Sequence, residues 1–140
     1  MRTILIAHRD ETFSEQLSTD LRKGGYRIIN CPGPWPPVER CIRCDKGYCP
    51  LTEAADLMIY DPELTAVDAQ GSRYNLAVDS ALAHPDVPML LAWSPKSTHD
   101  VDTVRTIRAR VPSVRVAGHE PAILLRQIGA LLAAPPNSSR

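Results

Sequence analysis

Four cysteines lie within nineteen positions of one another and are the residues of this chain best suited to chemistry. They are Cys31, Cys41, Cys44 and Cys49, and the sequence has no other cysteine. A pair two to four residues apart is typical of tetrahedral thiolate sites, because a tight turn directs both sulfurs at one ion. Arg40, Arg43 and Lys46 lie among them and would offset the negative charge of four thiolates. The spacing therefore predicts a four-cysteine metal site in residues 31–50.

The spacing does not specify the metal. Zinc suits four thiolates and would act as a structural staple for a segment that has no helix or strand periodicity. An iron–sulfur cluster is the alternative, which four thiolates also suit. The common ferredoxin spacings are not matched, although the plant type has the same gaps of four and two residues in the opposite order. Disulfide or thiol redox chemistry is a third interpretation. Histidine ligands are not expected, because His84 and His99 lie far along the chain.

Residues at or just beyond the ends of short apolar segments form a second candidate group. They are His8, Arg9, Asp10, Asp61, Trp93, Ser94, His119 and Glu120. If the apolar segments are parallel strands, these side chains gather at the carboxyl edge of one sheet, where such folds place their sites. Such an edge would suit small-anion binding or acid–base catalysis. The sequence has no glycine-rich phosphate loop and no nucleophile elbow, so we assign no catalytic residue, and an enzyme is the weakest hypothesis.

The elements that would position these residues alternate along the chain. Apolar runs predict strands at 3–7, 26–29, 57–60, 87–93 and 113–117. Residues spaced at helical intervals predict helices near 12–24, 74–84 and 100–111, and a last helix from Pro121. Residues 62–72 are expected to form a loop, and the Cys-rich loop replaces the usual connection between the second and third strands. This order predicts an α/β fold with a doubly wound, five-stranded parallel sheet.

Length and charge narrow the class of protein. The 140 residues predict one domain at 1–134, with a flexible tail at 135–140. Sixteen basic and sixteen acidic residues give a formal charge of zero, which argues against binding to nucleic acid or to a membrane surface. No apolar run reaches the roughly 20 residues of a membrane span, and the N-terminus does not resemble a signal peptide. We therefore expect a cytoplasmic protein.

Three stretches carry a resemblance to a known family. Residues 4–10, with Gly25 and Tyr26 closing the first helix, resemble the start of a response-regulator receiver domain of the CheY-like type. Residues 55–61 are similar to the strand that ends in the phosphoacceptor aspartate, and residues 83–91 to the entry into the fourth strand. The resemblance covers most of the chain except 31–50. It implies a flavodoxin-like fold and a role in signal transduction.

The family's chemical residues match poorly. Its acidic pair, which holds Mg²⁺, falls on His8 and Arg9. Its switch serine or threonine falls on Trp93, and its lysine before proline falls on Glu120. Asp61 alone keeps the family's residue type, at the phosphoacceptor position. The resemblance thus implies a degenerate pseudo-receiver, in which we expect Arg9 to pair with Asp61 and to fill the place of the metal with a fixed charge.

Two functional hypotheses follow from these residues. In the first, the chain is a non-catalytic regulatory module with a Cys₄ metal site, and it acts through protein partners. The resemblance implies a homodimer through the last two helices, where Leu124, Leu131 and Arg108 are the residues to test. In the second, the cysteines hold an iron–sulfur cluster or form a redox switch, and oxidation of the loop changes what the domain binds.

Overall fold

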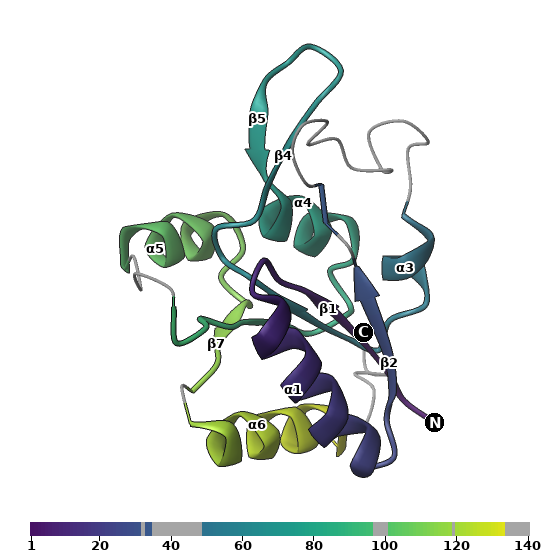
Figure 1. The fold of residues 1–140 in the computed structure, drawn as a ribbon. Helices are drawn as coiled ribbons and strands as arrows, with labels where there is room; N and C mark the ends of the chain where they lie inside the picture. The colour runs from purple at the N-terminus through teal and green to yellow at the C-terminus, as the bar shows by residue number, and fades with distance from the viewer. Residues whose placement is uncertain (32, 35–48, 97–100, 119, 134–140) are drawn as a thin grey trace.

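A computed structural model of the chain describes residues 1–31, 33–34, 49–96, 101–118 and 120–133 (Figure 1). Several predicted features lie outside these residues: Cys41, Cys44, His119, most of the Cys-rich loop and the tail at 135–140. The domain boundary at residue 134 therefore stays a prediction. Within the described part of the chain, no helix is long and apolar enough to cross a membrane.

Five parallel strands form the main sheet. They are β1 (Thr3–Ala7), β2 (Arg27–Cys31), β3 (Leu57–Tyr60), β6 (Met89–Leu91) and β7 (Arg115–Val116). Their order across the sheet is β2-β1-β3-β6-β7, so the strand order reverses beside β1. The predicted doubly wound, five-stranded parallel sheet is confirmed. This order places the carboxyl ends of β1 and β3 next to each other, and that of β6 beside β3.

Helices cover both faces of the sheet (Figure 1). The helices α1 (Glu11–Lys23) and α6 (Pro121–Ala133) pack on one face, and α4 (Leu76–Ala83) and α5 (Val101–Arg110) pack on the other. Each strand packs against both layers of helices, because successive side chains of a strand point to opposite faces of the sheet. In β1, Ile4 and Ile6 join the α1 and α6 side, while Leu5 and Ala7 join the α4 and α5 side. This double burial explains why the strands appear in the sequence as continuous apolar runs.

Local signals in the sequence set the helix ends. Asp10 caps α1, and its carboxylate accepts a hydrogen bond from the Phe13 amide at 3.1 Å. Asn75 caps α4 in the same way, accepting from the Val78 amide at 3.0 Å. After α1, Gly25 has a φ of +91°, a conformation that glycine adopts without steric cost. Pro121 occupies the first position of α6, as its fixed φ allows.

The segment after β3 differs from the prediction. Residues 62–72 were expected to form a loop, but β4 (Thr65–Val67) and β5 (Arg73–Asn75) pair as an antiparallel hairpin. Each strand has three residues, which is too short for alternation to be recognised in the sequence. A short helix, α3 (Pro50–Glu53), also precedes β3. The hairpin projects from the body of the domain beside α4 (Figure 1).

Candidate functional site

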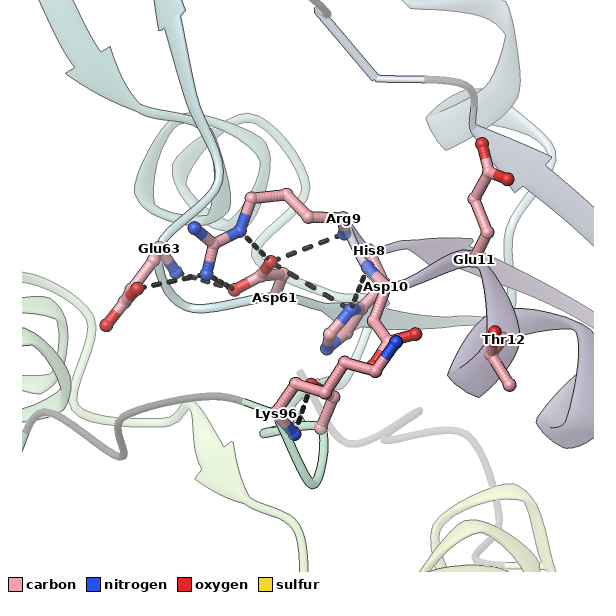
Figure 2. Close-up of a pocket in the computed structure, with 9 residues that line it drawn as sticks. His8, Arg9, Asp10, Glu11, Thr12, Asp61, Glu63 and Lys96 are labelled. Atoms are coloured by element: carbon pink, nitrogen blue, oxygen red, sulfur yellow. Dashed lines mark hydrogen bonds and ion pairs between the residues drawn. The ribbon is translucent and has the colours of Figure 1, made fainter.

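A cavity of about 530 Å³ opens at the carboxyl edge of the sheet, where β1, β3 and β6 end (Figure 2). The residues that line it are His8, Arg9, Asp10, Glu11, Thr12, Asp61, Glu63, Ser94 and Lys96. Of the predicted edge residues, His8, Arg9, Asp10, Asp61 and Ser94 meet here. The reversal of strand order beside β1 explains the gathering, because a crevice forms where neighbouring connections leave the sheet in opposite directions.

Asp61 is the buried centre of this cavity. It directly follows β3, and its amide donates to the carbonyl of Ala7 at 2.8 Å, which fixes it beside the end of β1. Its side chain has no exposed surface. The carboxylate accepts from the Glu63 amide at 2.9 Å and from the Arg9 amide at 3.3 Å. A buried carboxylate requires such donors, because an uncompensated charge away from water is costly.

The side chain of Arg9 compensates the negative charge of the Asp61 carboxylate. Its guanidinium donates from Nε to Asp61 Oδ2 and from Nη2 to Asp61 Oδ1, the latter at 3.2 Å. Nη2 also donates to Glu63 Oε2 at 3.0 Å, so one side chain joins two carboxylates (Figure 2). The hydrogen bonds to Asp61 raise the pKa of Arg9 above its ordinary value. The predicted pairing of Arg9 with Asp61 is confirmed.

His8 holds the end of β1 in place. The Asp10 amide donates to Nδ1 at 3.1 Å, so Nδ1 carries no proton and Nε2 donates to the Ala92 carbonyl at 2.8 Å. The ring also packs against Phe13 of α1, with the ring centroids 4.7 Å apart. Both ring nitrogens are therefore engaged, and the neutral imidazole links β1, β6 and α1. Nδ1 lies 3.9 Å from Asp61 Oδ2 without donating a hydrogen bond to it.

Asp10 faces the cavity while it caps α1. The hydrogen bond from the Phe13 amide lowers the pKa of the Asp10 carboxyl below its usual range, with further contributions from Ser94 and the charge of Lys96. Asp10 therefore stays ionised through the neutral range. Its charge also suits the N-terminal end of a helix, where the unpaired amides carry a partial positive charge.

Trp93 and Glu120 lie outside the residues that line the cavity. The side chain of Trp93 is buried, and Ser94, one residue further along, lines the cavity instead. Glu120 is exposed just before α6, and its carbonyl accepts from the amides of Ile123 and Leu124 at 3.0 Å each. These two residues therefore do not belong to this cavity.

Two lining residues, Glu63 and Lys96, were not predicted from the sequence. Glu63 lines the cavity because its amide donates to the Asp61 carboxylate, which forms a turn at Pro62. This turn places the Glu63 carboxylate within hydrogen-bond distance of Arg9. Lys96 follows Ser94 by two residues, and its amide donates to the Ser94 hydroxyl at 3.2 Å. Both residues lie just beyond a strand end, so a wider window after each predicted strand would have included them.

Charge in the cavity disfavours the small-anion hypothesis. Four carboxylates and two cations belong to the lining: Asp10, Glu11, Asp61 and Glu63 against Arg9 and Lys96. An incoming anion would meet a net negative surface, and Arg9 already holds two of the carboxylates. The charged side chains of this cavity therefore form a preorganised ion-pair network centred on Arg9.

Of the predicted metal ligands, the structure describes Cys31 and Cys49. Cys31 ends β2, and its sulfur accepts from the Gly33 amide at 3.3 Å. Cys49 is buried at the start of α3. Within the described ranges, no group of three or more histidine, cysteine, aspartate or glutamate side chains is arranged so that it could hold a metal ion. Cys41 and Cys44 lie outside these ranges, so the four-cysteine site stays a prediction.

The fold is similar to that of receiver domains of response regulators. One match is the non-phosphorylated HemR receiver domain from Leptospira biflexa, with 18% identity, 96% of this chain and 97% of that chain covered, and a TM-score of 0.63. Another is a putative response regulator from Chloroflexus aurantiacus, with 19% identity, 95% and 98% covered, and a TM-score of 0.64. A third is a CheY-like receiver domain protein from Methanospirillum hungatei, with 13% identity, 94% of each chain covered, and a TM-score of 0.61.

These matches confirm the resemblance at the level of the fold: the structure fits a receiver domain across most of the chain. By sequence, no protein-family model and no curated protein matches the chain. The receiver-like architecture is therefore established by the arrangement of strands and helices, while the chemistry has to be argued from the residues at the carboxyl edge.

Proposed function

We propose that this chain is a non-catalytic regulatory module of the receiver type, in which a fixed ion pair replaces metal-dependent phosphorylation. The observation that carries the proposal is the contact of the Arg9 guanidinium with both carboxylate oxygens of Asp61. In a receiver the aspartate at the end of this strand accepts a phosphoryl group. Here the same carboxylate is buried and already neutralised by a side chain of its own chain.

The chemistry of phosphoryl transfer explains why this pair matters. Transfer to a carboxylate needs a cation that neutralises the phosphoryl oxygens, and receivers hold Mg²⁺ for this purpose with an acidic pair. The residues that follow β1 here are His8 and Arg9. Arg9 would repel Mg²⁺, and both nitrogens of His8 are engaged with backbone groups. These contacts favour a module whose state does not depend on phosphorylation.

Treatment with acetyl phosphate and Mg²⁺ tests the proposal directly. We expect no phosphoryl label on the wild-type chain by intact-mass measurement, and no increase in melting temperature when Mg²⁺ is added. Labelling of the wild type that is lost in Asp61→Ala would overturn the proposal. As a matched comparison, Arg9→Asp removes the repelling charge and is expected to gain Mg²⁺-dependent stabilisation, whereas Arg22→Asp on the surface of α1 is not.

The module would act through protein contacts, and we propose a homodimer through the surface formed by α5, β7 and α6. Val116 of β7 and Ile123 of α6 expose 36% and 38% of their surface, and Arg108 of α5 is exposed as well. Leu124 was named for this surface from the sequence, but it is 3% exposed and belongs to the core between α6 and the sheet. Sedimentation analysis is the test: a monomer at high micromolar concentration would contradict the dimer.

We further propose that Cys31, Cys41, Cys44 and Cys49 hold one metal, with zinc as the first choice and an iron–sulfur cluster as the alternative. When bound, zinc would supply a structural staple, whereas a cluster would supply redox sensitivity. The amide of Gly33 donates to the sulfur of Cys31, a contact that favours the thiolate form which metals require. Cys49 is buried at the other end of the same segment.

Metal content measured together with the visible spectrum, on protein purified without oxygen, distinguishes these cases. One zinc per chain without colour supports the structural site. Iron with acid-labile sulfide supports the sensor, and the receiver-like body would then be its output surface. Absence of metal, with thiols that oxidise in pairs, would contradict both metal sites and leave thiol redox switching.

A further inference from the structure

The imidazole ring of His8 has no role in the proposed function, although it lies inside the cavity at the carboxyl edge. Its side chain is only 1% exposed. Nδ1 accepts from the Asp10 amide at 3.1 Å, and Nε2 donates to the Ala92 carbonyl at 2.8 Å. A backbone amide can only donate, so Nδ1 carries no proton in this arrangement. The structure therefore describes the neutral form of a side chain type that can also exist as a cation.

A proton on Nδ1 does not fit the contacts of the neutral ring. Two N–H groups, that of Nδ1 and that of the Asp10 amide, would then face each other. A carboxylate oxygen lies close to the same nitrogen, because Asp61 Oδ2 is 3.9 Å from Nδ1 (Figure 2). A hydrogen bond needs a separation of about 2.8 Å, so an approach of about 1 Å would join the charged ring to Asp61.

Arg9 already uses this carboxylate oxygen. Both its Nε and its backbone amide donate to Asp61 Oδ2. A charged His8 would therefore compete with Arg9 for one acceptor, and the difference in burial decides the outcome. The His8 side chain is 1% exposed and needs a partner for its charge, whereas Arg9 is 42% exposed and keeps water and Glu63 Oε2, at 3.0 Å from Nη2, as partners.

The other charged groups around the ring favour a positive charge on it. Asp10 and Glu11 lie in the connection from β1 to α1, Glu63 follows Asp61, and only Lys96, after β6, opposes such a charge. The Asp10 carboxylate accepts from the Phe13 amide at 3.1 Å, so it is already used as the cap of α1. That hydrogen bond is the main reason why the pKa of Asp10 is lowered. Asp61 is therefore the carboxylate that the ring can take as its partner.

We propose that His8 is a proton-operated switch of the Arg9–Asp61 pair. A proton from the solvent reaches Nδ1 through the cavity, the imidazolium takes Asp61 Oδ2, and Nε of Arg9 is released from that oxygen. The Asp10 amide loses its acceptor in the same step, so the change extends to the start of α1. The inference rests on the proposed function, because it presupposes the ion pair, and it names the signal that changes the state of the module: a fall in pH.

Nuclear magnetic resonance on the full chain, labelled with ¹⁵N, tests this switch. Long-range ¹H–¹⁵N correlations of the ring show which nitrogen of His8 carries a proton, and the Nε–H signal of Arg9 reports on its hydrogen bond. Spectra are recorded from about pH 8 to about pH 5, the range in which imidazole side chains ordinarily change charge. The test variant is His8→Gln, whose amide gains no charge in this range. The control is His84→Gln, which removes a histidine outside the cavity.

In the wild type we expect Nδ1 of His8 to gain a proton and the Nε–H signal of Arg9 to shift over the same pH interval. The control should keep this shift, and His8→Gln should lose it. Asp61→Asn is a second test variant, in which the shift is also lost because no carboxylate remains to be exchanged. Melting temperatures check that all variants fold.

Three results would each overturn the switch: no proton on Nδ1 in this range, a proton on Nδ1 without a shift at Arg9, or the same shift at Arg9 in His8→Gln. The last result would show that a carboxylate, and not His8, takes up the proton. Failure of the proposed function is a different result, in which Nε of Arg9 in the wild type shows no hydrogen bond even at about pH 8. A hydrogen-bonded Nε–H that does not respond to pH would contradict only the switch.

Discussion

Arg9 donates to Asp61 from its backbone amide and from its guanidinium at the same time. One residue at the end of β1 thus supplies three donor groups to a carboxylate at the end of β3 that has no exposed surface. Because β1 and β3 are neighbours in the sheet, this contact links the segment that follows β1 to the segment that follows β3. The charge of Asp61 is therefore compensated by groups of its own chain, which is the physical basis of the proposed phosphorylation-independent module.

The first prediction concerns the stability of this pair. Arg9→Ala leaves the buried carboxylate with only backbone donors, and we expect it to lower the free energy of unfolding by about 2 kcal/mol. Asp61→Asn removes the charge while keeping the shape, and we expect a loss of about 1 kcal/mol, because Arg9 is 42% exposed and keeps Glu63 and water as partners.

A double-mutant cycle separates the pair from its surroundings. The variant with both substitutions should lose about 1 kcal/mol less than the sum of the two single losses, as measured by urea unfolding. Strict additivity would show that the two side chains do not interact in solution, and the proposed replacement of the metal by Arg9 would lose its basis.

The second prediction concerns pH. Because the pKa of Asp10 is lowered in the folded state, its stabilising contribution is fully present above the ordinary carboxyl pKa. That contribution is lost as the pH falls through the lower, folded-state value. Asp10→Asn keeps the capping oxygen without the charge, so its stability should fall less between pH 6 and pH 3 than that of the wild type. The free energy of unfolding of both proteins would be measured by denaturant titration across this range. An equal decrease in the wild type and in Asp10→Asn would contradict a stabilising charge on the cap.

The third prediction separates folding from association on α6. Leu124→Ala creates a cavity against the sheet and should cost about 2–4 kcal/mol of stability. Ile123→Ala, one residue earlier, removes a partly exposed side chain and should change stability by less than about 1 kcal/mol. If the dimer surface is as proposed, Ile123→Ala weakens self-association in sedimentation experiments. Unchanged association in this variant would argue against the α5, β7 and α6 surface.

The fourth prediction concerns removal of the metal. If the four cysteines hold zinc, a strong chelator should lower the melting temperature, because binding to the folded state adds to its stability. Cys41→Ser with Cys44→Ser should lower the melting temperature and abolish the response to the chelator. Arg43→Ala, between the same two cysteines, should keep that response. A melting temperature that is insensitive to the chelator in zinc-containing wild-type protein would exclude a stabilising role for the site.

Much of the fold could be predicted from the sequence, because the patterns that indicate its strands and helices lie within short stretches of the chain. Double burial of the central strands leaves continuous apolar runs, so β1 and β3 were predicted with their observed bounds. Other elements were found with shifted ends: β6 covers 89–91 within the predicted 87–93, and β7 covers 115–116 within 113–117. The β4–β5 hairpin was missed because three-residue strands leave no recognisable alternation, and their pairing depends on contacts across the turn.

The sequence by itself determined which residue types stand at the strand ends, and therefore that Arg9 would meet Asp61. Only the tertiary structure decided which neighbours join them. Glu63 and Lys96 enter the cavity, whereas Trp93 and Glu120 do not line it. The physical reason is that side-chain direction beyond a strand end depends on the turn that follows, and turns are fixed by long-range contacts. Two hollows that Arg110 lines arise in the same way, from residues of α4, α5 and the β4–β5 hairpin that meet only in the folded chain.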